Sequence, residues 1–257
     1  MSGELSPAME TEFDQLAGWT EETLVGLSPE DAVAAACRGS GNPAALTWLA
    51  EAMQIGNTTT VLDVGGGLGG PAAWLQHHYG AQLVVAEPMP RAALGAHRLW
   101  KIPSVVAWAE HLPFPAGSFA AAWALGVLDT TSRKAELLAE LHRVVQSAGR
   151  VGLLAYERTV DTIDTLAAPE GNHFPSADEM AVLLDATGWA IVSHVNASTL
   201  SPPPLAWQER AADAGDRVAD EHDDDEAMTD VRSQERQMRS LLDQRIVVAR
   251  LYHTIRL

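Results

Sequence analysis

The stretch Val61-Leu62-Asp63-Val64-Gly65-Gly66-Gly67-Leu68-Gly69-Gly70 decides how this 257-residue chain is expected to fold. Its apolar first part stops at Gly65, and Pro71 then opens a helical pattern at a position where proline is well tolerated. Glycines between a strand and a helix let the backbone turn sharply, and they let a ligand approach without a Cβ in the way. The stretch therefore predicts a strand, a ligand-binding loop and a helix in succession.

Strand and helix signals alternate along the rest of the chain. Ser132 is expected to cap a helix that ends at Gly149, and Ser176 with Glu179 forms a capping box for another helix. Strands separated by helices predict a parallel sheet, with the ligand beyond the carboxyl ends of the strands and next to the first strand. Further strands are expected at residues 83–86, 105–107, 120–127, 151–156, 191–195 and 246–252.

Two glycine patterns overlap in the loop. Gly65, Gly67 and Gly70 satisfy G-x-G-x-x-G, the pattern of dinucleotide-binding loops. Asp63 with Gly65, Gly67 and Gly69 satisfies D-x-G-x-G-x-G, in which an acid precedes the first glycine. Either pattern predicts a ligand that contains an adenosine.

An adenosine-type ligand also needs an acceptor for its ribose hydroxyls at the end of the second strand. Glu87 follows the apolar run 83–86 at that place. A carboxylate accepts two hydroxyl hydrogen bonds there, and charge-assisted bonds of this kind are stronger than neutral ones. Glu87 and the glycine loop together predict a cofactor site rather than a purely structural turn.

The D-x-G-x-G-x-G run resembles motif I of the class I (Rossmann-like) S-adenosylmethionine-dependent methyltransferases. Ala109-Glu110-His111-Leu112-Pro113-Phe114-Pro115 resembles the family's segment after strand three, usually written A-E-x-L-P-F. The resemblance covers about residues 43–195, and the menaquinone and natural-product members look closest. It implies an α/β fold of three layers, in which a seven-stranded, mostly parallel sheet has an antiparallel last strand. Residues 1–42 would form a helical cap and residues 43–257 the methyltransferase domain, with a helical insertion at about 196–244.

The same resemblance implies S-adenosylmethionine as the cofactor and S-adenosylhomocysteine as the product. Asp63 would order the glycine loop near the methionine amino group. Trp108 stands where many members carry an aspartate that bonds the adenine amino group, so it would either wall the adenine or fill core space. The implied cofactor-contacting residues are Asp63, Gly65, Gly66, Gly67, Glu87, Pro88, Met89, Ala109 and Glu110.

The acceptor is expected beside the ends of the fourth and fifth strands. Asp129 follows the fourth strand, where it either orients or deprotonates the acceptor or caps the next helix. His173 lies on a proline-flanked loop, where it either accepts a proton near neutral pH or is a solvated surface residue. Asp129 and His173 are thus the candidate catalytic residues. Tyr156 and Glu157 end the fifth strand and are expected to face the same mouth.

Two further groups of side chains are expected to have plainer roles. His77 and His78 lack partners at metal-ligand spacing, so no metal site is expected. Trp19 and Trp207 lie outside the core domain, and a lid over an apolar acceptor is the role considered for them.

The charge and the single cysteine limit the classes of partner. A net charge of −17 has the wrong sign for holding a phosphate backbone, and charged or turn residues interrupt every apolar run. No partnership with nucleic acid or membrane is therefore expected, and a homodimer is compatible with the sequence. Cys37 is alone, which fits a reducing cytoplasm, and no signal peptide is recognised at the N-terminus.

The predicted function is transfer of a methyl group from S-adenosylmethionine to O, N or C of a small organic acceptor, such as a secondary metabolite or quinone precursor. Two alternatives stay open. The chain either uses the cofactor in a cyclisation or rearrangement, or binds it as a non-catalytic module. A nicotinamide dehydrogenase is a more distant third reading, because Asp63 is not required by the dinucleotide pattern.

Overall fold

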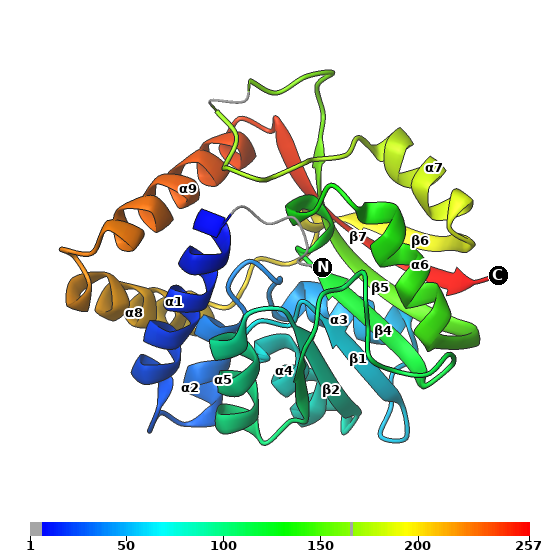
Figure 1. Cartoon of the computed structure of the whole chain (residues 1–257), viewed down its shortest axis with the longest axis horizontal. Coiled ribbons are helices and arrows are strands. Elements are labelled where there is room, and N and C mark those ends of the chain that lie inside the picture. Colours follow the sequence, from blue (N-terminus) through cyan, green and yellow to red (C-terminus); the bar gives the residue numbers. More distant parts are fainter. Residues whose placement is uncertain (1–6, 165–166) are drawn as a thin grey trace.

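A seven-stranded sheet with the strand order β3-β2-β1-β4-β5-β7-β6 forms the middle layer of the fold (Figure 1). The computed structural model describes residues 7–164 and 167–257. The order reverses between β1 and β4, and a ligand site is expected beyond the carboxyl ends of the strands there. The strands are β1 (Thr60–Val64), β2 (Gln82–Glu87), β3 (Ser104–Val106), β4 (Phe119–Leu125), β5 (Val145–Arg158), β6 (Trp189–Asn196) and β7 (Val247–Arg256).

The register confirms a mostly parallel sheet with an antiparallel last strand. β1 pairs in parallel with β2 and β4, while β7 runs antiparallel to both β5 and β6. The central strands are apolar because they are covered on both faces, as residues 121–125 of β4 show by being buried throughout.

Helices cover both faces of the sheet and fill the two halves of the core. Side chains of α3 (Pro43–Ala52), α4 (Gly70–Tyr79) and α5 (Pro90–Trp100) pack on one face around Trp123. Those of α6 (Lys134–Val144) and α7 (Ala177–Ala186) pack on the other face around Trp189. The predicted three-layer α/β class is therefore confirmed.

Four helices from two distant parts of the chain lie together at one end of the sheet (Figure 1). They are α1 (Pro7–Leu24), α2 (Pro29–Ala36), α8 (Leu205–Glu221) and α9 (Glu226–Asp243), and they are called the cap below. The cap has its own apolar core, in which Leu16 of α1 meets Val218, Met228 and Val231 of the insertion. The division of the chain at residue 42 into two domains stays a prediction.

The two tryptophans considered for a lid are used for packing instead. Trp19 stacks on His222 with ring centroids 4.1 Å apart, and Trp207 packs against the apolar core that surrounds Trp123. Neither lines the cavity described below, so the lid role expected for them is wrong. A large aromatic side chain buries the most apolar surface where two elements meet, but the sequence does not show which two elements those are.

Helix ends differ from the prediction at one place and agree at another. The helix expected from Ser132 to Gly149 begins at Lys134 and ends at Val144, because the chain passes directly into β5. The hydroxyl that accepts a backbone N–H ahead of this helix belongs to Thr131, which bonds the amide of Arg133. The capping box of α7 is confirmed, since Ser176 and Glu179 bond each other's backbone amides.

Two 3₁₀ helices lie among the described residues around the sheet. The 3₁₀ helix Leu128–Thr130 follows β4, and a second one, Ala197–Thr199, follows β6 and leads into the insertion. Within the residues described, no helix is both long and apolar enough to cross a lipid bilayer.

Candidate functional site

A cavity of about 600 Å³ lies at the carboxyl ends of β1, β2 and β4, under the cap. The glycine loop and Glu87 form its floor at one end, and Asp129 and Tyr156 lie in its wall at the other. α1 and α9 supply an apolar cover through Leu16, Met238 and Leu242 (Figure 1 shows these helices). The cavity thus joins the predicted cofactor end to the predicted acceptor end.

The glycine loop leaves open space at one position only. A Cβ on Gly65 would lie 2.5 Å from Val127, and one on Gly66 would lie 2.8 Å from the carboxyl carbon of Asp63. Gly67 has a φ of +54°, lines the cavity, and no atom lies within 4 Å of the place where its Cβ would be. Its bare backbone therefore faces the hollow, which fits the close approach of a ligand.

Glu87 connects the glycine loop to the turn after β2. Its Oε2 accepts the Gly67 N–H at 2.8 Å, and its Oε1 accepts the Met89 N–H at 3.0 Å. The side chain is buried, and burial raises its pKa to about 7 while these two N–H groups act in the opposite direction. A carboxylate held in this way presents its remaining lone pairs to the cavity, where ribose hydroxyls would bond.

Asp63 lies beneath the loop rather than in the cavity wall. It is 1% exposed, and its Oδ2 has no hydrogen-bond partner among the described residues. Its pKa is raised to about 8, chiefly by burial and also by the nearby Glu87 charge, while the Trp123 side chain and the Ala72 backbone act in the opposite direction. A buried acid with an unused acceptor atom below the loop fits a cationic ligand group above it, such as the amino group of the methionine part.

The segments after β2 and β3 form the side wall at the end of the cavity where the cofactor is predicted. Met89, Ala109 and Glu110 are buried and line the cavity, as do Pro88 and the partly exposed Trp108. Trp108 therefore lines the cavity, and its contact with an adenine stays a prediction.

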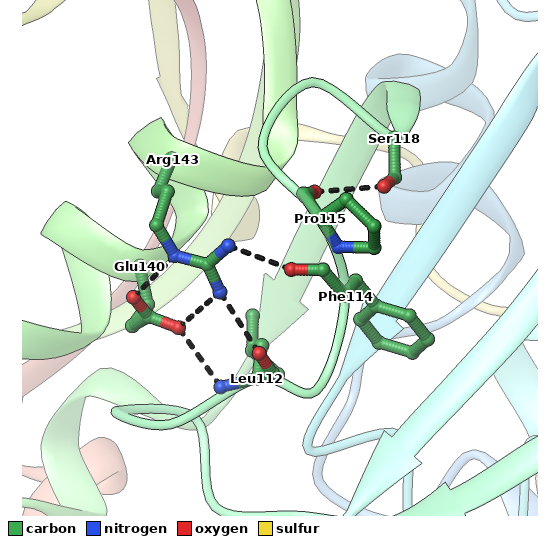
Figure 2. A network of polar contacts seen from close by, with 6 residues as sticks. All are labelled: Leu112, Phe114, Pro115, Ser118, Glu140 and Arg143. Atoms are coloured by element: carbon green, nitrogen blue, oxygen red, sulfur yellow. Dashed lines mark hydrogen bonds and ion pairs between the residues drawn. The ribbon is translucent and has the colours of Figure 1, made fainter.

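A network of polar contacts fixes the segment after β3 to α6 (Figure 2). Arg143 donates to the carbonyls of Leu112 at 2.8 Å and Phe114 at 2.6 Å. Glu140 accepts the Leu112 N–H at 2.9 Å and pairs with Arg143 at 2.7 Å. The backbone of the Leu-Pro-Phe run is thus held in place by hydrogen bonds to side chains of α6.

Asp129 is the buried acid of the acceptor end. It is 3% exposed, lines the cavity, and its Oδ1 has no partner within residues 7–164 and 167–257. Burial raises its pKa to about 6, while its own backbone N–H and the charge of Lys134 act in the opposite direction. An acid that ionises near neutral pH suits proton transfer as well as orientation of an acceptor.

His173 lies next to Asp129 but outside the cavity wall. Its backbone N–H donates to the Asp129 carbonyl at 2.7 Å, and its side chain is exposed. The structure therefore brings the two candidate residues together through their backbones, and only Asp129 belongs to the lining.

Tyr156 and Glu157, which are expected to end the fifth strand, face opposite sides, so the expectation that both face the mouth is wrong for Glu157. Tyr156 lines the cavity, and its hydroxyl donates to the Gly39 carbonyl at 3.3 Å. Glu157 is buried on the other face, where it accepts hydrogen bonds from Tyr252 and from Arg250 at 2.8 Å. The strand continues through Arg158, and successive side chains of a strand alternate between faces.

The rim of the cavity carries its basic residues. Arg38, on the loop after α2, bonds Glu235 of α9 at 2.7 Å and so ties the N-terminal part of the cap to the insertion. Arg239 is the other basic residue in the lining. Across the described part of the chain, no group of three or more His, Cys, Asp or Glu could hold a metal ion.

A methyltransferase domain model matches residues 62–153, which run from β1 into β5 and include the glycine loop, Glu87 and Asp129. Methyltransferase GfsG of Streptomyces halstedii is 31% identical over 135 residues, which make up 48% of this chain and 47% of that protein. The chain is thus similar to methyltransferases over residues 62–153, and it has the fold of the class I S-adenosylmethionine-dependent methyltransferases. The match spans about half the length of this curated relative.

Solved structures share the methyltransferase fold at low identity. The [4+2]-cyclase SpnF is 19% identical with a TM-score of 0.66, over 82% of this chain and 79% of that one. Geranyl diphosphate C-methyltransferase from Streptomyces coelicolor A3(2), solved with Mg²⁺, geranyl-S-thiolodiphosphate and S-adenosylhomocysteine, is 15% identical with a TM-score of 0.62. That similarity covers 82% of this chain and 75% of the other. These likenesses show the fold of the methyltransferase domain.

Sequence reasoning missed two parts of this cavity. Thr131 joins the two ends of the wall, and Met238 and Leu242 of α9 cover the acceptor end. The spacing of Met238 and Leu242 by four residues is a helical signal, but it does not indicate what that face of the helix contacts.

Proposed function

We propose that the chain transfers a methyl group from S-adenosylmethionine to O, N or C of a small organic acceptor. The observation that carries the proposal is the single cavity that runs from Gly67 and Glu87 to Asp129 under an apolar cap. Cofactor and acceptor would meet inside one hollow, where the protein can align the methyl group with the attacking atom.

The residues of this chain would bind and align the reactants. Bound S-adenosylmethionine supplies a methyl group on an already activated sulfonium, so positioning is the main contribution of the protein. Glu87 would hold the ribose, and the open backbone at Gly67 would accommodate the methionine part. Asp129 would orient the acceptor and receive its proton when the attacking atom is a hydroxyl or an amine.

The acceptor class is inferred from the cavity and from the relatives. The cover of Leu16, Met238 and Leu242 favours an apolar body, and Asp129 favours a polar group that faces inward. GfsG is named a methyltransferase, and the Streptomyces coelicolor enzyme methylates geranyl diphosphate at carbon. A natural-product or quinone-like molecule fits this combination.

Calorimetric titration with S-adenosylmethionine and S-adenosylhomocysteine tests the cofactor part of the proposal. Glu87→Ala should weaken both by about 1–3 kcal/mol, because a buried acceptor of hydroxyl and amide hydrogen bonds is lost. Glu51→Ala, at an exposed position on α3 outside the lining, is the matched control and should bind as the wild type does. Binding of neither ligand by the wild type would refute the proposal.

Product analysis separates methylation from the alternative activity. The similarity to a [4+2]-cyclase favours a second candidate, in which the bound cofactor assists a cyclisation without being consumed. Methyl-labelled cofactor with a panel of hydroxylated and amino acceptors should give labelled product, and Asp129→Asn should slow it for acceptors that must lose a proton. An isomerised product with the cofactor intact would instead support the cyclase, and binding without any turnover would support a non-catalytic module.

A further inference from the structure

The turn at residues 127–134 links β4 to α6 and passes along the cavity. Asp129, Thr130 and Thr131 of this turn all line it. Asp129 lies at the acceptor end, whereas Glu110, on the separate segment after β3, belongs to the wall of the cofactor end. These two acids therefore come from different segments, and one side chain connects them.

Thr131 makes that connection from a buried position. Its hydroxyl donates to Oε1 of Glu110 at 2.9 Å and accepts the backbone N–H of Arg133 at 3.0 Å. Its carbonyl accepts the ammonium of Lys134 at 2.5 Å. Thr131 is 9% exposed, so water competes little with these three bonds.

Glu110 depends on Thr131 for its hydrogen bonding. The carboxylate is 6% exposed, and among the described residues the Thr131 hydroxyl is its hydrogen-bond donor. A buried carboxylate that loses its donor is costly and rearranges toward water. Removal of this hydroxyl would consequently move the side wall next to Ala109.

The same residue limits where Asp129 can lie. Asp129 is two positions before Thr131, and its carbonyl accepts the backbone N–H of His173 at 2.7 Å. Two hydrogen bonds thus hold this short turn. One runs from the His173 N–H to the Asp129 carbonyl, and the other from the Thr131 hydroxyl to Glu110. A shift of Glu110 on ligand binding passes to Asp129 through two residues of backbone.

We propose that Thr131 is a positioning residue, which ties the cofactor wall at Glu110 to the acid of the acceptor end, Asp129. The inference rests on the proposed function, because it assigns the two ends of the cavity to cofactor and acceptor. It predicts that cofactor binding orders the acceptor side before an acceptor arrives.

A thermodynamic cycle on S-adenosylhomocysteine binding tests the link. Thr131→Val keeps the shape of the side chain and removes the hydroxyl, and it should weaken binding about tenfold or more. Thr131→Ser keeps the hydroxyl and should stay within about threefold of the wild type. In a Glu110→Gln background, Thr131→Val should add less than about threefold, since the neutral amide oxygen accepts the hydroxyl hydrogen bond more weakly than the carboxylate does.

Hydrogen exchange reports the acceptor side separately. Addition of S-adenosylhomocysteine should slow exchange of the His173 amide in the wild type and in Thr131→Ser, and it should not slow it in Thr131→Val. Melting temperatures identify a variant that fails to fold. In that case Glu110→Gln tests the Thr131–Glu110 hydrogen bond from its acceptor side, by S-adenosylhomocysteine binding and by exchange of the His173 amide.

The outcomes separate this inference from the proposed function. If the wild type binds and Thr131→Val binds equally well, or protects His173 fully, the positioning role is refuted and the cofactor site stands. The positioning role is also refuted if Thr131→Val lowers the affinity for S-adenosylhomocysteine equally with and without Glu110→Gln. Failure of the wild type to bind either S-adenosylmethionine or S-adenosylhomocysteine overturns both.

Discussion

Two glycines in this chain form a matched pair for testing the ligand contact at the loop. Gly67 and Gly117 have φ values of +54° and +66°, and neither has an atom within 4 Å of the place where a Cβ would be. Gly67 lines the cavity and Gly117, in the turn before β4, does not. Alanine at either position meets the same backbone strain, but only at Gly67 does the added methyl occupy ligand space.

The expected magnitudes follow from these differences. An L-residue in the left-handed region costs about 1–2 kcal/mol, so both alanine variants should melt roughly 2–8 °C below the wild type. A methyl forced into a ligand contact adds about 1–3 kcal/mol, so Gly67→Ala should weaken S-adenosylhomocysteine binding about 5- to 150-fold. Gly117→Ala should bind as the wild type does.

Thermal unfolding and calorimetric titration of the three proteins measure both effects. The refuting result is wild-type affinity in Gly67→Ala, because the open side of Gly67 would then face no ligand. Equal loss of affinity in both variants would contradict the reasoning in another way, since it would trace the loss to general destabilisation.

Two other predictions concern charge. The Asp63 carboxyl has a pKa of about 8 in the fold against an ordinary 3.8, so its contribution to stability is present at low pH and is lost as pH rises through about 8. Urea unfolding should therefore show the wild type losing stability relative to Asp63→Asn between about pH 4 and pH 8, and parallel pH profiles would contradict the buried acid. Arg38→Met and Glu235→Gln should each speed S-adenosylhomocysteine dissociation by no more than about fivefold, because half-exposed ion pairs contribute about 0–1 kcal/mol. Stopped-flow measurement checks this, and the double variant should go no further than either single one.

Local spacing in the sequence was sufficient to predict the glycine loop and the acid Glu87 at one end of the cavity. The strand, glycine loop and helix around Asp63, and the acid at Glu87, are contiguous signals whose meaning depends only on neighbours in the sequence. The mostly parallel sheet follows from the alternation of strands and helices, and the capping box of Ser176 and Glu179 is likewise a local pattern.

The acceptor end could not be predicted to the same depth, because it depends on contacts between distant segments. Glu157 was assigned to the mouth because the end of β5 was placed too early, and strand alternation sends its side chain to the other face. Trp19 is expected in a lid because it lies outside the core domain, but it stacks on His222, the residue that follows α8. The bond between Thr131 and Glu110 joins two loops that only the sheet order brings together.

The place of β7 in the sheet has a consequence for synthesis of the protein. β7 is the last of the described strands to leave the ribosome, yet it lies between β5 and β6 and pairs with both. Until residues 247–256 emerge, β5 presents an open edge and β6 has no strand beside it. A nascent chain with such an edge is prone to pair with other chains, so we expect chaperone contact to persist until this strand is released.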